Sequence, residues 1–241
     1  MARAGIRRRC AAEEAADEAL RDGQLEDAET LLKDALEGYR LVEDAHRQGR
    51  TLLKTGIARM HDDPQEALLL IGQAEALFDP TAEPILACCA RHHEIWCLND
   101  LGYPAGALRL LESSRPLCRR FRRLQLVTRQ QSWLEARIDH RLGKHQEAED
   151  RLRLVVKMLL ADLKHPNELL LVALDLLRAM AAREGTKARM LEVLDSLCSL
   201  FDDLGLHPLR LAVWIQLRRN VEQGLPEDFD WGEIQYFFRY A

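Results

Sequence analysis

A spacing of about 40 residues, repeated five times, is the feature that most constrains the fold of this chain. At each place a Gly or Asp is followed five residues later by Ala or Met: Gly23 with Ala28, Asp62 with Ala67, Gly102 with Ala107, Gly143 with Ala148 and Gly185 with Met190. Successive copies are 39, 40, 41 and 42 residues apart. Such a period predicts a helical-repeat array, in which each repeat buries its apolar face against its neighbours.

Two further positions repeat in register with these pairs. The residue four positions after the small residue is always aliphatic. A residue seven or eight positions before the Gly or Asp belongs to the face of the preceding helix that packs against it. These sets are Leu32, Ile71, Leu111, Leu152 and Leu194, and Ala16, Thr55, Ile95, Ala136 and Leu177. The pattern predicts helical hairpins that cross at the small residue, with Gly ending the first helix or Asp capping the second.

Two segments carry a resemblance to a known family: GQLEDAETLLKDAL over residues 23–36 and WLEARIDHRLGKHQEAEDRLRLVV over residues 133–156. They resemble the tetratricopeptide repeat, and the resemblance covers about residues 9–205. The period exceeds the family's usual length of about 34 residues, as in regulatory bacterial versions of the fold. HEAT-type repeats, which share the longer period, are the structural alternative.

We therefore predict an all-α fold: a right-handed α-solenoid of about five tetratricopeptide-like repeats with C-terminal capping helices. The predicted parts are a disordered basic N-terminus (1–8), the repeat array (9–205) and the capping helices (206–241). Helices are expected at about 9–21, 25–45, 48–61, 64–78, 84–100, 104–121, 124–141, 145–163, 167–183, 187–203, 208–223 and 231–240. The last of these carries Trp231, Ile234, Phe237, Phe238 and Tyr240. We interpret it as a cap, with a docking helix for a partner or a second copy of the chain as the alternative.

Charge and cysteine content restrict the partners and the compartment. The net charge of −5 combines an excess of five positive charges over residues 81–145 with acidic flanks. This charge distribution argues against general nucleic-acid binding, although the positively charged residues 81–145 could attract an acidic protein. The six cysteines form no CxxC pair, no apolar run is long enough to span a membrane, and no signal peptide is evident. We expect a cytoplasmic protein.

The family resemblance implies a concave groove lined by the first helix of each repeat. Its groove positions fall on Arg59, His92, Trp96, Asn99, Trp133, Arg137, His140 and Arg141, and the fifth repeat offers Asp175 and Arg183. Two tryptophans and two arginines in adjacent repeats could hold a peptide, because aromatic rings supply burial and guanidinium groups bind carboxylates. The alternative is that the tryptophans belong to the inter-helix core and the arginines to a solvated face.

A basic run forms a second candidate surface, the basic edge, made of Arg115, Arg119, Arg120, Arg122 and Arg123 and continued by Arg129. Cations near a helix C-terminus are favourable on dipole grounds alone. The functional alternatives are contact with an acidic protein or with nucleic-acid phosphates.

Chemistry-bearing motifs are scarce. Cys89, His93 and Cys97 share one helical face, but the helical rise separates the outer two by roughly 12 Å, so they cannot share one metal ion. The sequence contains no GxxxxGK[ST], GxGxxG or GxSxG motif. We therefore expect no metal, no cofactor and no catalysis.

The predicted function is a non-catalytic adaptor or regulatory subunit that captures a protein segment in the groove, as part of a larger complex. The alternative is a regulator that senses a peptide or small molecule and acts in trans on a partner effector. A homo-oligomer through the C-terminal aromatic helix is also possible.

Overall fold

The computed structural model describes residues 11–19, 24–60, 62–121, 123–163, 165–226 and 228–240. The chain divides into two compact units, Met1–Leu124 and Gln125–Ala241, and each is described by itself. The predicted disordered segment 1–8 lies outside the described residues.

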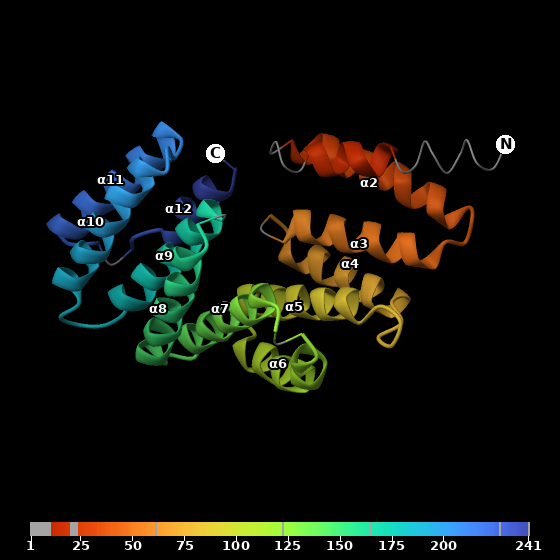
Figure 1. Ribbon diagram of the computed structural model, residues 1–241, viewed down its shortest axis with the longest axis horizontal. Coiled ribbons are helices and arrows are strands. Elements are labelled where there is room, and N and C mark those ends of the chain that lie inside the picture. Colours follow the sequence, from red (N-terminus) through yellow and green to blue (C-terminus); the bar gives the residue numbers. More distant parts are fainter. Residues whose placement is uncertain are drawn as a thin grey trace. The chain divides into compact units, whose positions relative to one another are not determined.

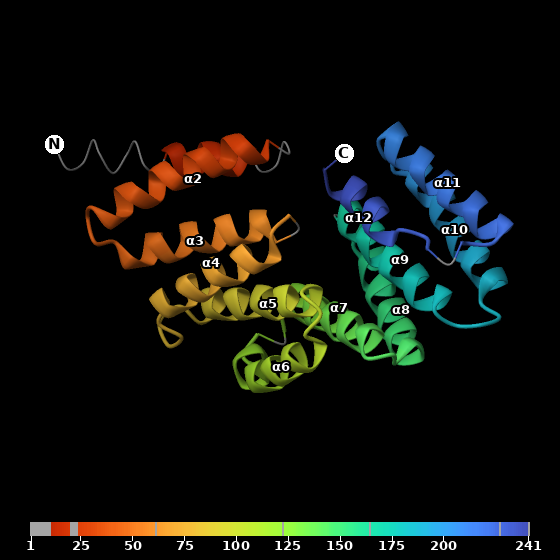
Figure 2. The same ribbon diagram turned by 180° about the vertical axis from the view of Figure 1, so that it is seen from behind.

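The first unit is a series of antiparallel helices, each packed on the next (Figures 1 and 2). A helix over residues 11–19 comes first. It is followed by α2 (Leu25–Arg40), α3 (Ala45–Arg59), α4 (Pro64–Leu77), α5 (Pro84–Asp100) and α6 (Pro104–Arg119).

The second unit continues the same pattern. Its helices are α7 (Gln125–Arg141), α8 (His145–Ala161), α9 (Pro166–Ala181), α10 (Lys187–Asp203), α11 (Pro208–Gln223) and α12 (Trp231–Tyr240). Each of α8 and α11 packs on the helix before it, whereas α12 turns back and packs against α9 and α11. No described helix is long and apolar enough to cross a bilayer.

Proline sets the start of many of these helices. It occupies the first position of α4, α5, α6, α9 and α11, where its fixed φ suits a helix and its missing N–H is not needed. Two predicted boundaries at one turn are wrong: the expected helix 25–45 ends at Arg40, and the helix expected from residue 48 begins at Ala45. Glu43 adopts a left-handed φ of 55°, and the Asp44 side chain accepts a hydrogen bond from the Arg47 amide, which caps a new helix at Ala45.

The repeat positions behave as the sequence predicts. Gly102, Gly143 and Gly185 have φ values of 84°, 77° and 70°, the left-handed conformation in which Gly ends a helix. The small residues at the crossing and the aliphatic residues one turn later are all buried, namely Ala28, Ala67, Ala107, Ala148 and Met190 with Leu32, Ile71, Leu111, Leu152 and Leu194. The prediction of an all-α array of helical hairpins is confirmed. Gly23 lies outside the described residues.

The second repeat departs from the pattern in two details. Asp63, not Asp62, caps α4, accepting from the Glu66 amide at 2.9 Å. Thr55 is only half-buried, and its neighbour Gly56 makes the close contact with α4 instead. A Cβ added at Gly56 would lie 2.6 Å from Cγ1 of Ile71 and 3.2 Å from the carbonyl oxygen of Ala67.

The C-terminal helix is held by aromatic packing. Trp214 of α11 is fully buried, with ring centroids 5.4 Å from Phe201 of α10 and 5.9 Å from Phe238 of α12. Phe229 and Trp231 form a second pair at 4.9 Å, at the point where the segment 224–230 meets α12. Such aromatic packing against the preceding helices is what a capping helix requires. The boundary between the repeat array and the cap stays a prediction. The side chains of Phe237 and Tyr240 are outside the described part.

We predict opposite effects for two glycine-to-alanine changes. Gly56→Ala should lower the melting temperature, because its methyl group would meet the backbone of Ala67 and the Ile71 side chain. Gly72→Ala, on α4 with no atom within 4 Å of the added Cβ, should raise stability by about 1 kcal/mol through helix propensity. Urea unfolding of both variants tests this, and equal effects would contradict the close approach at Gly56.

Candidate functional site

The predicted groove draws on α3 and α5 in the first unit and on α7 and α9 in the second. On α3, Arg59 is already engaged within the chain. Its guanidinium pairs with Glu29 and lies 3.6 Å from Glu66. Arg59 therefore ties α3 to its neighbours α2 and α4.

On α5, the predicted groove residues lie largely inside the first unit. Trp96 and Asn99 are buried, with exposed fractions of 5% and 1%, and His92 is half-buried with its ring centroid 6.1 Å from that of Trp96. Among the described residues, no hydrogen-bond donor reaches the buried Oδ1 atom of Asn99. Trp96 thus contributes to the core, as the alternative interpretation allowed.

In the second unit, Trp133 and Arg137 of α7 converge on Asp175 of α9. Trp133 Nε1 donates to Asp175 Oδ2 at 2.7 Å, and Arg137 Nη1 lies 3.2 Å from the same oxygen. All three are buried, with exposed fractions of 4%, 8% and 7%. One carboxylate therefore satisfies two buried donors and fixes α7 to α9. The sequence analysis places all three residues at groove positions but does not predict that Asp175 binds the two donors.

Arg129 was assigned to the basic run, and this is wrong. It is 4% exposed, and its guanidinium donates twice to Glu168, from Nε at 3.0 Å and from Nη2 at 2.7 Å. The Gln130 amide donates to the same carboxylate at 2.8 Å. This bidentate pair joins the starts of α7 and α9, two turns from the Asp175 cluster.

His140, near the end of α7, is half-buried and close to His145 of α8. Their Nδ1 atoms are 3.1 Å apart, so one ring must present a lone pair to the other. Burial, then the charges of Arg178 and His145, lowers the pKa of His140 to about 4, with Asp175 opposing. His140 is therefore neutral at pH 7. Its neighbour Arg141 is exposed.

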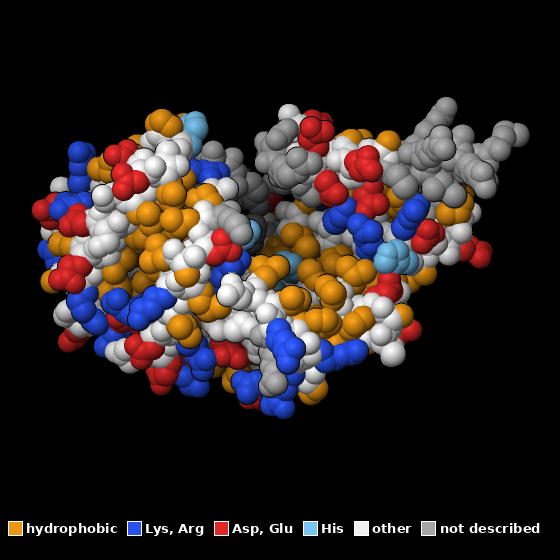
Figure 3. All heavy atoms as spheres, in the orientation of Figure 1, with side chains coloured by type: hydrophobic (Ala, Val, Ile, Leu, Met, Phe, Trp, Pro, Cys, Tyr) orange, Lys and Arg blue, Asp and Glu red, His pale blue; other side chains and the backbone are white. Residues whose placement is uncertain are grey.

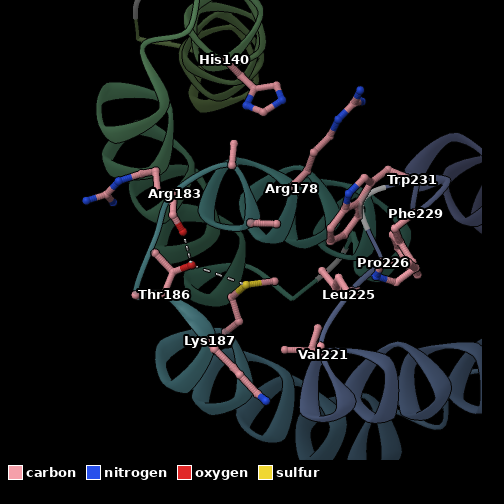
Figure 4. Close-up of a pocket in the computed structure, with 15 residues that line it drawn as sticks. His140, Arg178, Arg183, Thr186, Lys187, Val221, Leu225, Pro226, Phe229 and Trp231 are labelled. Carbon is pink, nitrogen blue, oxygen red and sulfur yellow. Dashed lines mark hydrogen bonds between the residues drawn. The ribbon is translucent and has the colours of Figure 1, made fainter.

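A hollow of about 590 Å³ lies beside His140, wholly within the second unit (Figure 4). The ends of α7, α9 and α11, the start of α10 and the segment leading to α12 line it. One part of its wall is apolar or aromatic, made of Met190, Val221, Leu225, Pro226, Phe229 and Trp231. The cations at the wall are Arg178, Arg183 and Lys187, and none of the described lining residues is Asp or Glu. We call this hollow the α9–α12 pocket.

Arg183 is turned away from the pocket by a buried carboxylate. Glu149 of α8 is 1% exposed and pairs with Arg183, with Arg153 at 3.0 Å and with Arg189 at 3.1 Å. In Figure 4 the Arg183 guanidinium points away from the other lining side chains. The other lining cations are Arg178 and Lys187. A cavity of this size with an apolar wall and two cations suits a group that is partly apolar and partly anionic.

Sequence reasoning did not anticipate this pocket, although it singled out His140. The wall residues come from segments up to 91 positions apart, between His140 and Trp231. They meet because α12 folds back onto α9, and no local pattern encodes that return. The only signal was the aromatic content of residues 229–240.

The basic edge lies in the first unit. Figure 3 shows Lys and Arg side chains gathered over α6. Arg115, Arg119, Arg120 and Arg123 are exposed, and Arg122 lies outside the described residues. Their positions at and beyond the last turn of α6 fit favourable interaction with the helix dipole. Their role in binding stays a prediction.

One cysteine of α5 contacts a cysteine of the neighbouring helix. Cys88 Sγ lies 3.2 Å from Cys118 Sγ of α6, while Cys97 is buried in the core. In the described part of the chain, no group of three His, Cys, Asp or Glu side chains is arranged to hold a metal ion.

Comparison with known proteins identifies the fold. No protein-family model and no curated protein matches the chain. A Rap protein in complex with competence and sporulation factor superposes with a TM-score of 0.74 at 14% identity, over 88% of this chain and 57% of the Rap chain. A putative kinesin light chain of Podosopora anserina with nearly identical TPR-like repeats gives 0.59 at 21% identity, over 83% and 97%. The chain therefore has a tetratricopeptide-like helical-repeat fold, and it spans little more than half of the Rap chain.

The buried acceptor on α9 gives a first test of this arrangement. Asp175→Ala should destabilise the protein by about 3–5 kcal/mol, because it leaves the Arg137 charge and the Trp133 N–H buried without this acceptor. Asp150→Ala, on the exposed face of α8, should change stability by less than about 0.5 kcal/mol. Urea unfolding measures both, and a small effect at Asp175 would show that the cluster does not hold α7 to α9.

The neutral state of His140 predicts a pH dependence. Because the folded state lowers its pKa to about 4, the unfolded chain binds more protons between that pH and about 6.5. Stability should therefore fall as the pH drops through this window, and His140→Gln should lose less stability over the same range. Melting temperatures at intervals from pH 7.5 to pH 4 test this, and parallel curves for the two proteins would contradict it.

Proposed function

We propose that this chain is a non-catalytic interaction scaffold, an adaptor or regulatory subunit, that captures a segment of a protein partner. Its anchor is the α9–α12 pocket. The observation that carries the proposal is the lining of that hollow, whose described residues combine an apolar and aromatic wall with Arg178 and Lys187 and include no carboxylate.

The chemistry of the pocket indicates what part of a partner it accepts. An aliphatic or aromatic side chain would be buried against Leu225, Phe229 and Trp231, while a nearby carboxylate would be neutralised by Lys187 and Arg178. Charged side chains at the rim contribute mainly to orientation and association rate, and the aromatic wall supplies the burial. An acidic segment with an apolar anchor residue fits both the aromatic wall and the two cations.

Two ion pairs between α7 and α9 support this role. Arg129 pairs with Glu168 and Arg137 with Asp175, which would hold the two helices in place before a ligand binds. His140 at the pocket wall and the exposed Arg141 next to it belong to the proposed binding surface. The contribution of Arg59, His92, Trp96, Asn99, Trp133, Arg137 and the basic edge stays a prediction, and the buried members would act by holding the helices in place.

A second candidate function is favoured by the size of the hollow. A volume of about 590 Å³ lies within the range of small-molecule sites, so the pocket could accept a short peptide or metabolite and the chain could act in trans on an effector. Native mass spectrometry of the chain purified from its own host would reveal a retained small ligand. A ligand-dependent change in radius of gyration would favour this sensor function over the rigid adaptor.

The adaptor proposal predicts a charge-specific loss of binding. A photo-crosslinking amino acid at position 225 should capture one stoichiometric protein in the host that encodes the chain. Lys187→Glu should weaken that complex by about tenfold or more, because it places an anion where the partner's anion binds. Lys157→Glu makes the same charge change at an exposed site on α8 that does not line the pocket, and it should leave the affinity within about twofold. Equal losses in the two variants would contradict the pocket as anchor.

A further inference from the structure

A pair of thiols in the first unit lies outside the candidate binding site. Cys88, in the second turn of α5, and Cys118, in the last turn of α6, face each other across the hairpin with their sulfur atoms 3.2 Å apart. Cys88 is buried at 8% exposure, and Cys118 is half-buried. Both cysteines are reduced here, and their helices pack directly on one another.

We propose that Cys88 and Cys118 form a peroxide-responsive dithiol, a modification site at which a hydroperoxide converts the two thiols into a disulfide. Cys118 is the attacking sulfur and Cys88 the resolving one.

The different surroundings of the two sulfurs assign these roles. The contact between the sulfurs lowers the pKa of Cys118 to about 7, whereas this contact and burial raise the pKa of Cys88. The lowered pKa favours the thiolate of Cys118, the form that attacks peroxides. Cys118 is also the more accessible of the two, and exposed Arg115 and Arg119 flank it on the same helix end. Their positive charge opposes the unfavourable field that a helix C-terminus exerts on a thiolate.

The reaction balances with a hydroperoxide as the oxidant. The Cys118 thiolate attacks the distal peroxide oxygen, the O–O bond breaks, and the alkoxide leaves and takes up a proton, which leaves Cys118 as a sulfenic acid. The Cys88 sulfur then attacks the Cys118 sulfur, the S–O bond breaks, and the Cys88 proton leaves with the hydroxide as water. The two thiols lose two electrons in total, and a dithiol reductant restores them.

The local geometry requires little movement for this step. The sulfurs must approach from 3.2 Å to about 2.05 Å. Pro116, inside α6 and two residues before Cys118, lacks the N–H that would bond to the preceding turn, so the last turn of α6 can shift at low cost. The resulting bond would tie the end of α6 to the start of α5 and close a loop of 30 residues.

Peroxide oxidation of the full chain tests this proposal. With hydrogen peroxide at pH 7 followed by alkylation, the reactive thiols should fall from six to four, and dithiothreitol should restore them. Because Cys88 is adjacent to Cys89, variants identify the partner: the intramolecular disulfide should form in Cys89→Ser and Cys198→Ser but not in Cys88→Ser or Cys118→Ser. A bond through Cys89, or a disulfide only between chains, would overturn the assignment.

The order of attack has its own readout, which does not require every variant to be stable. In Cys88→Ser, dimedone should label Cys118 as a sulfenic acid at a rate at least roughly fivefold that of Cys198, whose thiol pKa is raised by burial. If Cys88→Ser does not fold, fragmentation of the cross-linked tryptic peptides from the wild-type chain locates the bond directly. Dimedone on Cys198 but not on Cys118, or no linked peptide in the wild-type chain, would refute the proposal.

Discussion

The close contact between the two helices of each hairpin is the constraint on which the rest of the structure depends. A small or flexible residue five positions after each turn is buried in every described copy, and an aliphatic residue one helical turn later is buried beside it. Ala28, Ala67, Ala107 and Ala148 allow the backbones to approach, and the left-handed glycines reverse the chain at once. The remaining faces of the first helices are then free to carry polar contacts to the next hairpin.

Those polar contacts explain why several residues predicted to bind a ligand are instead buried between helices of the second unit. Trp133, Arg137 and Asp175 form one buried cluster, and Arg129 with Glu168 forms another. Burying a charge is costly, so each guanidinium is stable only where its carboxylate is present. Aromatic and arginine residues at helical spacing can therefore indicate buried contacts between helices as well as ligand binding. The α9–α12 pocket differs because Lys187 is exposed at its rim and its lining, as far as the structure describes it, includes no carboxylate.

The repeat predicted the helices well because its signal is local. Ala148 and Leu152 are one turn apart on one helix, and the glycine before them fixes the reversal, so each hairpin could be located from about 20 residues. The pairing of Trp133 with Asp175 could not be predicted, although both fall on groove positions, because they are 42 positions apart and their contact depends on how α7 packs on α9. Arg129 was misplaced for the same reason, since the pairing with Glu168 is visible only after the helices are assembled. The pocket was missed because the return of α12 to α9 has no counterpart in the repeat.

Hydrogen–deuterium exchange of the chain, alone and in complex with its captured partner, tests the central claim most directly. If the partner is anchored in the α9–α12 pocket, backbone amides over residues 178–190 and 221–231 should gain protection while those of α8 stay unchanged. Protection confined to the basic edge at residues 115–124, with none at 178–190 or 221–231, would contradict the account and move the binding surface to the first unit.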